Sequence, residues 1–453
     1  IGEYIKSNRT TEFYLGSNNA IYKRDSSTTP ETLTAQSFAG SPQTISDSNW
    51  QWVNFNNELW AVQASHKPIN FDGSAWKDVE DLTAYAANTG VTTFNPSCAL
   101  GNFGRMWYGG ITEDPGTIFY SDNLIGEKLN GGAAGSVNLR TVWGSDEIVG
   151  FSSIMDKLII FGKNNIAIYN GASAPASMAL DELIQGVGLA GRDNIVYVGS
   201  DVLFMSYEGF ISLSRITETD GKAPIQELTI SIRNDLTRLL STADVNNIKT
   251  AYYQEDGLVI TFIPDENKAY VFDFAVSNKA RLPRITSWSF VEAPLCGLGT
   301  IDGTFFMGLS NSVATYSDYF DVSISNSTSE FANQTVCEAA GNTWDGAICW
   351  SYTYSKYSYT FQTSWLDLNS PSISKIVKSG IFTIIGGRGA TSEVLVYKDF
   401  NIEDPFSKSF SLTSNTAISL FNDVTTFYGV AKYASSAGPK EYKISLGRTG
   451  KTI

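Results

Sequence analysis

The sequence predicts an all-β protein, consisting of a β-propeller of about seven blades followed by a smaller β-sandwich-like domain. Three observations predict this fold. The 453-residue chain has 39 Gly and is 13% aromatic, a composition that favours short strands and tight turns over helices. A hairpin pattern returns along residues 1–320 at a steady spacing. From about residue 321 that pattern stops, and Ser, Thr and Asn become frequent.

The repeated unit is clearest in MDKLIIFGKNNIAIYNGAS, residues 155–173. Two apolar runs, LIIF and IAIY, are joined by the polar turn GKNN, which is typical of a β-hairpin. The same order of features occurs seven times. A landmark in the first strand of each copy lies 44 to 55 residues after the previous one, at Leu15, Leu59, Met106, Leu158, Leu203, Leu258 and Phe305.

This spacing, with a further apolar strand before several of the hairpins, is typical of a propeller that has four short strands in each blade. An isolated unit could not bury both of its apolar faces, so we expect the copies to stack in a closed ring. We assign residues 1–320 to the propeller. A six-bladed ring is the alternative, in which the first copy belongs to another domain.

Two insertions with helical character interrupt the repeats. Residues 174–186, APASMALDELIQG, contain helix formers between a Pro and a Gly. Residues 223–247 carry an apolar stripe at helical spacing, formed by Ile232, Leu236, Leu239 and Leu240. We expect a helix in each insertion, and the second helix would cap the propeller or contact another subunit.

Residues 321–453 are predicted to form the second β domain, of sandwich type. Strand-like runs resume in KIVKSGIFTIIGG, SEVLVYKDF and EYKISLG without the propeller spacing. The domain opens with a Ser/Thr/Asn-rich and Cys-bracketed excursion at residues 321–360. Its tyrosines could form an aromatic ladder for packing, or a platform for stacking on sugars, and they are Tyr352, Tyr354, Tyr357 and Tyr359.

The four cysteines do not have the spacing of a metal site, because no CxxC pair is present. Cys337 and Cys349 bracket a Gly-containing loop that could bring them together as a disulfide, while a reducing compartment would keep them as thiols. Cys98 and Cys296 lie in apolar segments, so we expect both to be small buried side chains.

The sequence offers little for catalysis. The only histidine, His66, is expected in a surface turn, and no GxSxG, HExxH or phosphate-binding loop accompanies it. Acidic pairs such as Glu113 with Asp114 and Asp181 with Glu182 fall in expected turns or helix starts, and only fragments of a sialidase-type box occur. We therefore predict no catalytic, cofactor-binding or metal-ligating residues and a protein that is not an enzyme.

The net charge of −14 and the pI of about 4.6 argue against a surface that grips a nucleic-acid duplex, because such surfaces cluster Lys and Arg. Solubility accounts for this charge, and an acidic conduit wall past which nucleic acid slides is the alternative. No apolar run is long enough to span a membrane, so no membrane insertion is expected. The chain starts without Met and ends in strand-like sequence, as part of a longer chain would.

Several segments carry a resemblance to a known family. They include NPSCALGNFGRMWYGG followed by GTIFYSD, EIVGFSSIMDKLIIFGKNNIAIYNG, GLAGRDNIVYVGSDVLFMSYEGFISLS, KAYVFDF followed by RLPRITSW, and SWLDLNSPSISKIVKSGIFTIIGGRGATSEVLVYKDF. In these patterns of apolar and turn residues, spanning roughly residues 95–400, the chain resembles the tail nozzle or tail-tube propeller proteins of short-tailed, podovirus-type bacteriophages.

The resemblance implies a structural virion protein, assembled in the host cytoplasm, that retains the genome and conducts it during ejection. It implies a ring of identical subunits, commonly six, below the head-to-tail adaptor on the portal side, with tail fibres as further neighbours. Genomic DNA would pass through the channel without specific binding. The family has no active-site residues or cofactor to transfer, and the Cys337 to Cys349 excursion has no counterpart in its pattern.

The alternative function is a tail module that recognises the host surface. In that interpretation the Tyr-rich segment of residues 351–365 would bind surface glycans. The two functions predict different positions in a particle, because a conduit forms rings at the tail and a receptor-binding module forms peripheral appendages.

Overall fold

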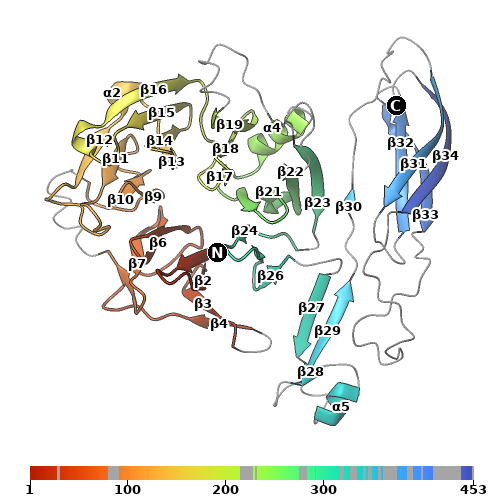
Figure 1. Ribbon diagram of the computed structural model, residues 1–453, viewed down its shortest axis with the longest axis horizontal. Helices are drawn as coiled ribbons and strands as arrows, with labels where there is room; N and C mark the ends of the chain where they lie inside the picture. The colour runs from red at the N-terminus through yellow and green to blue at the C-terminus, as the bar shows by residue number, and fades with distance from the viewer. Residues whose placement is uncertain are drawn as a thin grey trace. The chain divides into compact units, whose positions relative to one another are not determined.

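Residues 1–316 form a seven-bladed β-propeller, as the repeats predicted. The computed structural model describes residues 1–27, 31–79, 91–214, 228–229, 232–274, 283–290, 292–316, 321–326, 334–339, 343–344, 349–355, 359–360, 375–384, 391–398, 401–411 and 440–450. Seven antiparallel sheets follow one another in chain order around a common centre (Figure 1). Each of the seven predicted hairpins supplies two neighbouring strands of one sheet, which excludes the six-bladed alternative.

Four of the blades have four strands in the order of the sequence. Blade 1 consists of β1 (Gly2–Ile5), β2 (Thr11–Gly16), β3 (Ile21–Asp25) and β4 (Thr32–Ala35). Blade 2 consists of β5 (Gln51–Phe55), β6 (Glu58–Gln63), β7 (His66–Phe71) and β8 (Trp76–Asp78). Blade 3 consists of β9 (Cys98–Asn102), β10 (Arg105–Gly109), β11 (Thr117–Tyr120) and β12 (Gly135–Asn138), and a short helix, α2 (Arg140–Trp143), follows it. Blade 4 consists of β13 (Ile148–Ile154), β14 (Lys157–Gly162), β15 (Asn165–Asn170) and β16 (Ala179–Gln185).

The last three blades depart from four strands. Blade 5 has β17 (Ile195–Val198), β18 (Asp201–Ser206) and β19 (Gly209–Ser212). Blade 6 has β20 (Lys249–Tyr253), β21 (Leu258–Ile263), β22 (Lys268–Asp273) and β23 (Arg284–Ser289), with β30 (Tyr359–Thr360) as a fifth strand and the 3-10 turn η3 (Pro264–Glu266) between β21 and β22. Blade 7 has β24 (Cys296–Gly299), β25 (Phe305–Gly308) and β26 (Val313–Thr315).

The second strand of a blade is buried on both faces, which explains the continuous apolar runs in the sequence. In β14, Leu158 and Ile160 belong to the apolar cluster shared with blade 3, whereas Ile159 and Phe161 belong to the cluster shared with blade 5. Alternate residues point to opposite faces of a strand, so one strand joins two neighbouring interfaces. Strands β6, β10, β18 and β21 repeat this arrangement, and six apolar clusters link the consecutive blades from blade 1 to blade 7.

The first strands of neighbouring blades approach closely, and glycine permits this. A Cβ atom added at Gly299 in β24 would lie 2.2 Å from the carbonyl oxygen of Tyr252 in β20. At Gly101 in β9, an added Cβ would lie 2.9 Å from the Cβ of Phe55 in β5. Both distances are shorter than van der Waals contact, so a side chain at either position would push two blades apart.

A helix follows the three strands described for blade 5. Helix α4 (Arg233–Thr242) lies within the predicted insertion 223–247, of which residues 223–227 and 230–231 lie outside the described residues. Its buried side chains Leu236, Leu239 and Leu240 join the apolar cluster between blades 5 and 6. The helix therefore covers that cluster, which is the capping role expected for it.

The helix predicted for residues 174–186 is wrong. The segment forms a 3-10 turn, η1 (Pro175–Ser177), followed by strand β16, which pairs antiparallel with β15. Helix propensity is a weak preference, and the unpaired edge of β15 offers a ladder of hydrogen-bond partners that a helix could not use. The helix formers in ALDELIQ are therefore the fourth strand of blade 4.

Two further predictions are corrected. His66 is not a surface turn residue, because it is the first residue of β7 and its side chain is buried. Cys296 is half-buried at the start of β24, while Cys98 is buried as predicted.

The chain divides into two compact units at limits that differ from the predicted boundary after residue 320. The first unit comprises Ile1–Tyr316, Asn326–Trp350 and Ser358–Thr360, and therefore contains much of the excursion assigned to the second domain. Strand β30 returns to the propeller and pairs with β23, which accounts for the last of these segments. The excursion contains α5 (Gln334–Ala339), β28 (Thr343–Trp344) and β29 (Cys349–Ser355), and β29 lies between β28 and β27 (Asp321–Asn326) in one sheet.

The second unit comprises residues 317–325, 351–357 and 361–453. Its described strands form two antiparallel pairs, β31 (Lys375–Ile384) with β34 (Lys440–Gly450), and β32 (Thr391–Lys398) with β33 (Asn401–Ser411). The sandwich stays a prediction, because residues 361–374, 385–390 and 412–439 lie outside the described residues. None of the helices described is long and apolar enough to cross a bilayer.

The contact between blade 7 and blade 1 closes the ring, and it differs from the other six interfaces. No buried apolar cluster of the described residues joins the two blades. Phe306 instead packs against Phe13 with the ring centroids 5.2 Å apart, and the guanidinium of Arg24 lies 4.7 Å from the Phe306 ring. The Ile301 N–H also donates to the buried Glu3 carboxylate at 3.3 Å.

We predict that Phe306→Ala weakens ring closure. The change removes a buried aromatic side chain and its contacts with Phe13 and Arg24, so the free energy of unfolding should fall by about 3 kcal/mol. Urea unfolding followed by tryptophan fluorescence measures the loss. Leu33→Ala, at a 40% exposed position on β4, is the control and should cost less than about 0.5 kcal/mol. Equal losses in the two variants would show that closure does not depend on Phe306.

Candidate functional site

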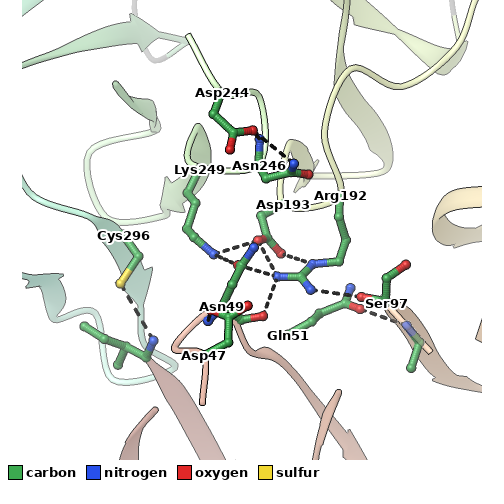
Figure 2. A network of polar contacts seen from close by, with 12 residues as sticks. Asp47, Asn49, Gln51, Ser97, Arg192, Asp193, Asp244, Asn246, Lys249 and Cys296 are labelled. Carbon is green, nitrogen blue, oxygen red and sulfur yellow. Dashed lines mark hydrogen bonds and ion pairs between the residues drawn. The ribbon is translucent and has the colours of Figure 1, made fainter. Parts of the chain in front are cut away.

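A polar network lies where the connections into several blades converge (Figure 2). Its members precede or begin the first strands of four different blades. Asn49 precedes β5 of blade 2, Ser97 precedes β9 of blade 3, Arg192 and Asp193 precede β17 of blade 5, and Lys249 begins β20 of blade 6. Blades 2 and 5 are not neighbours in the ring, so side chains from both can meet only near the propeller axis.

Arg192 is the centre of this axial network. Its Nη1 donates to the Ser97 carbonyl at 2.9 Å, and its Nη2 donates to the Asn49 side-chain oxygen at 2.7 Å. The same guanidinium donates through Nε and Nη2 to both carboxylate oxygens of Asp193, at 2.9 and 2.7 Å. One side chain therefore ties blade 5 to the connections of blades 2 and 3.

Lys249 joins the network from blade 6. Its ammonium donates to Asp193 at 2.7 Å and also to the Asn49 side-chain oxygen. The main chains are linked as well, because the Thr250 N–H donates to the Asp193 carbonyl at 2.9 Å. Asn49 and Asp193 thus each receive hydrogen bonds from both cations, and every charged group in the network has an opposite charge or a carbonyl beside it.

The charges are largely shielded from solvent, so the opposite charges in the network stabilise one another in place of water. The side chain of Arg192 is 10% exposed and that of Asp193 is 18% exposed. Burial alone would raise the pKa of Asp193, but the charges of Arg192 and Lys249 outweigh it and hold that pKa well below its ordinary value. Burial opposes the charge on Arg192, whereas Asp193 and, at longer range, Asp47 raise the pKa of the guanidinium.

This arrangement is suited to holding blades together and offers little for acid–base or nucleophilic chemistry. The donors of Arg192 and Lys249 are directed at protein oxygens, which occupy the positions that an anionic ligand would need. Cys98 follows Ser97 directly, but burial raises the pKa of its thiol to about 12, so it is protonated at neutral pH. The axial network therefore acts as a tie across the end of the propeller axis.

The residues that the sequence singled out lie elsewhere. Cys337 and Cys349 are bonded as a disulfide with their Cα atoms 5.7 Å apart, and both are buried. Within the acidic pairs, Asp114 forms an ion pair with Arg140, and Asp181 forms one with Lys157. Of the residues that the structure describes, no three His, Cys, Asp or Glu gather as a metal site.

The tyrosine ladder stays untested. Tyr357 lies outside the described residues, and so do the side chains of Tyr352, Tyr354 and Tyr359. Sequence reasoning missed the axial network altogether. The only signal was the Arg-Asp pair in GLAGRDNIVYV, which stands directly before a strand at a position where buried charge is unusual.

Comparisons with known proteins find only distant similarity, and this similarity is one of fold. The chain matches no protein-family model, and no curated protein is similar to it. Solved structures with a similar backbone include PorZ, a surface component of the type-IX secretion system of Porphyromonas gingivalis, at 11% identity and a TM-score of 0.44 over 90% of this chain. The chain spans 44% of the length of that protein.

Two further solved structures are similar at lower scores. A streptogramin B lyase matches at 10% identity and a TM-score of 0.37, over 60% of this chain and 83% of the lyase. The extracellular domain of the two-component system BT4673 from Bacteroides thetaiotaomicron matches at 9% identity and a TM-score of 0.34, over 69% of this chain and 46% of that one. At these identities and scores, no function transfers from any of the three to this chain.

We predict that Asp193→Asn destabilises the propeller by about 3 kcal/mol at neutral pH, because it leaves two shielded cations without their carboxylate. The pKa of Asp193 is lowered in the fold, so its contribution is present above the unfolded value of about 3.9 and is lost as the pH falls below it. The difference between wild type and variant should stay level from about pH 7 to about pH 5 and shrink below about pH 4. Urea unfolding at each pH measures it.

The matched control is Asp156→Asn, which makes the same chemical change in the exposed turn between β13 and β14. It should change the free energy of unfolding by less than about 0.5 kcal/mol at any of these pH values. If the two Asn variants have the same stability at neutral pH, the axial network contributes nothing to holding the blades.

Proposed function

We propose that this chain is a structural protein of a short-tailed phage tail, in which identical propellers form a ring below the head-to-tail adaptor. In this role the propeller is a rigid wall element, and the genome is retained and conducted through the space enclosed by several subunits. The observation that carries the proposal is the axial network. Its bonds between blades occupy the propeller axis, so each propeller serves as a wall element and not as the channel itself.

The axial network determines where a conduit can run. A duplex that entered along the propeller axis would have to break the bonds from Arg192 to Ser97 and Asn49. It would also separate Lys249 from Asp193, leaving shielded charges without partners. We therefore propose that the conduit runs between subunits, where the outer surfaces of the propellers would face a common channel.

Four of the five segments that carry the family resemblance lie in the blades, and the fifth, residues 364–400, belongs to the second compact unit. The segment NPSCALGNFGRMWYGG contains β9 and β10, EIVGFSSIMDKLIIFGKNNIAIYNG contains β13 to β15, and GLAGRDNIVYVGSDVLFMSYEGFISLS contains β17 to β19 and Arg192. Within the propeller, the segments that resemble the phage family thus supply strands of blades 3 to 6 and a central part of the axial network.

The charge of the chain fits a wall past which DNA moves. At −14 the net charge repels phosphates, so a duplex would not be held by counterion release. Many copies in a ring would each add this repulsion to the channel. A closed ring of identical subunits also uses one heterologous interface repeated around an axis, which needs no additional protein to complete it.

Electron cryomicroscopy of the full chain, alone and with its adaptor, tests the proposal. We expect closed rings, with six subunits as the copy number that the family resemblance implies, and a channel on the ring axis outside every propeller. A chain that stays monomeric with its adaptor present, or DNA density through the centre of a propeller, would contradict it. Peripheral appendages on the particle would instead fit a host-recognition module.

A binding measurement gives an independent check. Fluorescence anisotropy with a labelled duplex should show weak binding and a shallow dependence on salt, because few cations are available to displace counterions. Tight binding that falls steeply between about 50 mM and 200 mM salt would indicate a DNA-gripping surface and contradict the conduit.

A further inference from the structure

The single histidine of the chain lies in a site that accommodates one protonation state better than the other. His66, at the start of β7, is 1% exposed. Its Nδ1 lies 2.7 Å from the carbonyl oxygen of Lys67, and its Nε2 lies 3.0 Å from the carbonyl oxygen of Gln43. Both ring nitrogens therefore face main-chain acceptors, one on the same strand and one on the connection between blades 1 and 2.

The chemistry of imidazole makes this arrangement selective. A neutral imidazole has one N–H donor and one acceptor nitrogen, whereas the imidazolium has two donors. Only the imidazolium can donate to both carbonyls at once. In the neutral form, one nitrogen lone pair points at a carbonyl oxygen, and no hydrogen bond can form between these two acceptors.

The surroundings contain a counter-charge for the imidazolium. Asp78 on β8 is buried, and its Oδ2 accepts a hydrogen bond from the Gln43 N–H at 2.8 Å. Its Oδ1 is buried and has no hydrogen-bond partner among the residues that the structure describes. The Gln43 residue thus lies between the two side chains, with its N–H toward the carboxylate and its C=O toward the imidazole. This polarity matches an anionic Asp78 and a cationic His66.

The other groups around His66 do not remove this preference. The Trp50 ring packs against the imidazole with the centroids 5.3 Å apart, a contact that favours a cation. The charged residues on the adjoining elements are Lys67 on β7 and Asp47 on the connection, both exposed, Lys77 on β8 beside Asp78, and Glu58 at the opposite end of β6. Asp78 is therefore the buried charge nearest in the hydrogen-bond network.

Gln43 is the point at which the connection between blades 1 and 2 is attached to blade 2. Its side chain accepts from the Lys67 N–H at 3.2 Å and donates to the Ser65 carbonyl at 3.3 Å. Further along, the same connection supplies Asn49 to the axial network. A change at Gln43 therefore acts on the segment that ends at the propeller axis.

We propose that His66 is a proton-operated clamp on the connection formed by residues 41–49. The imidazolium binds the Gln43 carbonyl and fixes this connection to blade 2. Loss of the Nε2 proton turns the bond to the Gln43 carbonyl into a contact between two acceptors. The attachment of the connection to blade 2 is then weaker, because only the three other hydrogen bonds of Gln43 hold it. This inference is independent of the proposed role in a phage tail, because it depends only on contacts within one subunit.

Nitrogen-15 NMR of the full chain labelled at histidine tests the first step directly, because the chain has one histidine and gives one imidazole signal set. At about pH 5 both ring nitrogens should carry a proton, and the signals should change to those of a single tautomer as the pH is raised toward about 8. Hydrogen–deuterium exchange, normalised for the intrinsic effect of pH, should rise several-fold in residues 41–49 over the same change. Residues 91–97, the connection into blade 3, are the internal control and should not respond.

Three variants distinguish the clamp from a merely structural histidine. His66→Gln cannot gain a proton, so its exchange in residues 41–49 should be high and independent of pH. Asp78→Asn removes the counter-charge with little change of shape, and should move the wild-type transition to lower pH. Lys67→Ala alters an exposed side chain and keeps the carbonyl, so it should retain the transition.

A single protonated ring nitrogen at every pH down to about 5 would overturn the proposal. So would an exchange rate in residues 41–49 that does not follow the histidine transition. If His66→Gln fails to fold, the wild-type spectra and the Lys67→Ala variant still decide between these outcomes.

Discussion

The fold depends on one constraint, which is that the second strand of nearly every blade is apolar on both faces. In β14, Leu158 and Phe161 face opposite neighbours, and neither face can be left in water without losing the stabilisation that burial provides. A single blade or a short row of blades would leave such a face exposed at each end. Closing the ring removes both ends, so the circular arrangement follows from the two-faced strands.

The same constraint explains why the ring has one unusual interface. Six interfaces are built from apolar clusters, but the first and last blades meet through Phe13, Phe306, Arg24 and the Glu3 carboxylate. These contacts combine aromatic packing with charge. Because blade 1 and blade 7 are formed from the two ends of the propeller sequence, no connection runs directly from one of these blades to the other. Directional contacts can supply the alignment that a direct connection would give.

The sequence was informative wherever structure is local. The seven hairpins could be predicted because LIIF, GKNN and IAIY place strand, turn and strand within a few residues, and the buried faces of β6, β14 and β21 appear as continuous apolar runs. Strand β16 was predicted as a helix because ALDELIQ consists of helix formers, and only pairing with β15 makes it a strand. The error thus arose where tertiary contacts outweigh local preference.

The candidate site could not be predicted for a different physical reason. Arg192 meets Ser97 from 95 positions away and Asn49 from 143 positions away, and no periodicity in the sequence marks contacts of that range. His66 was assigned to a turn because ASHKPI contains turn residues, yet the turn ends one residue earlier and the imidazole points inward. A shift of one residue in a strand end decides whether a polar side chain lies in the turn or in the strand. Sequence patterns do not locate strand ends to within one residue.

Apolar and polar contacts are therefore divided between different parts of the propeller. The blades are joined by packing that changes little with pH or salt, whereas the connections and the strand ends that they contact contain polar groups, among them Asn49, Asp193, Lys249 and His66. A change in protonation can act on a connection while the apolar clusters stay intact, because the clusters contain few groups that titrate. The propeller thus combines a rigid ring of blades with connections whose attachment depends on charge, and any regulation of this protein by solution conditions would act first at the connections near its axis.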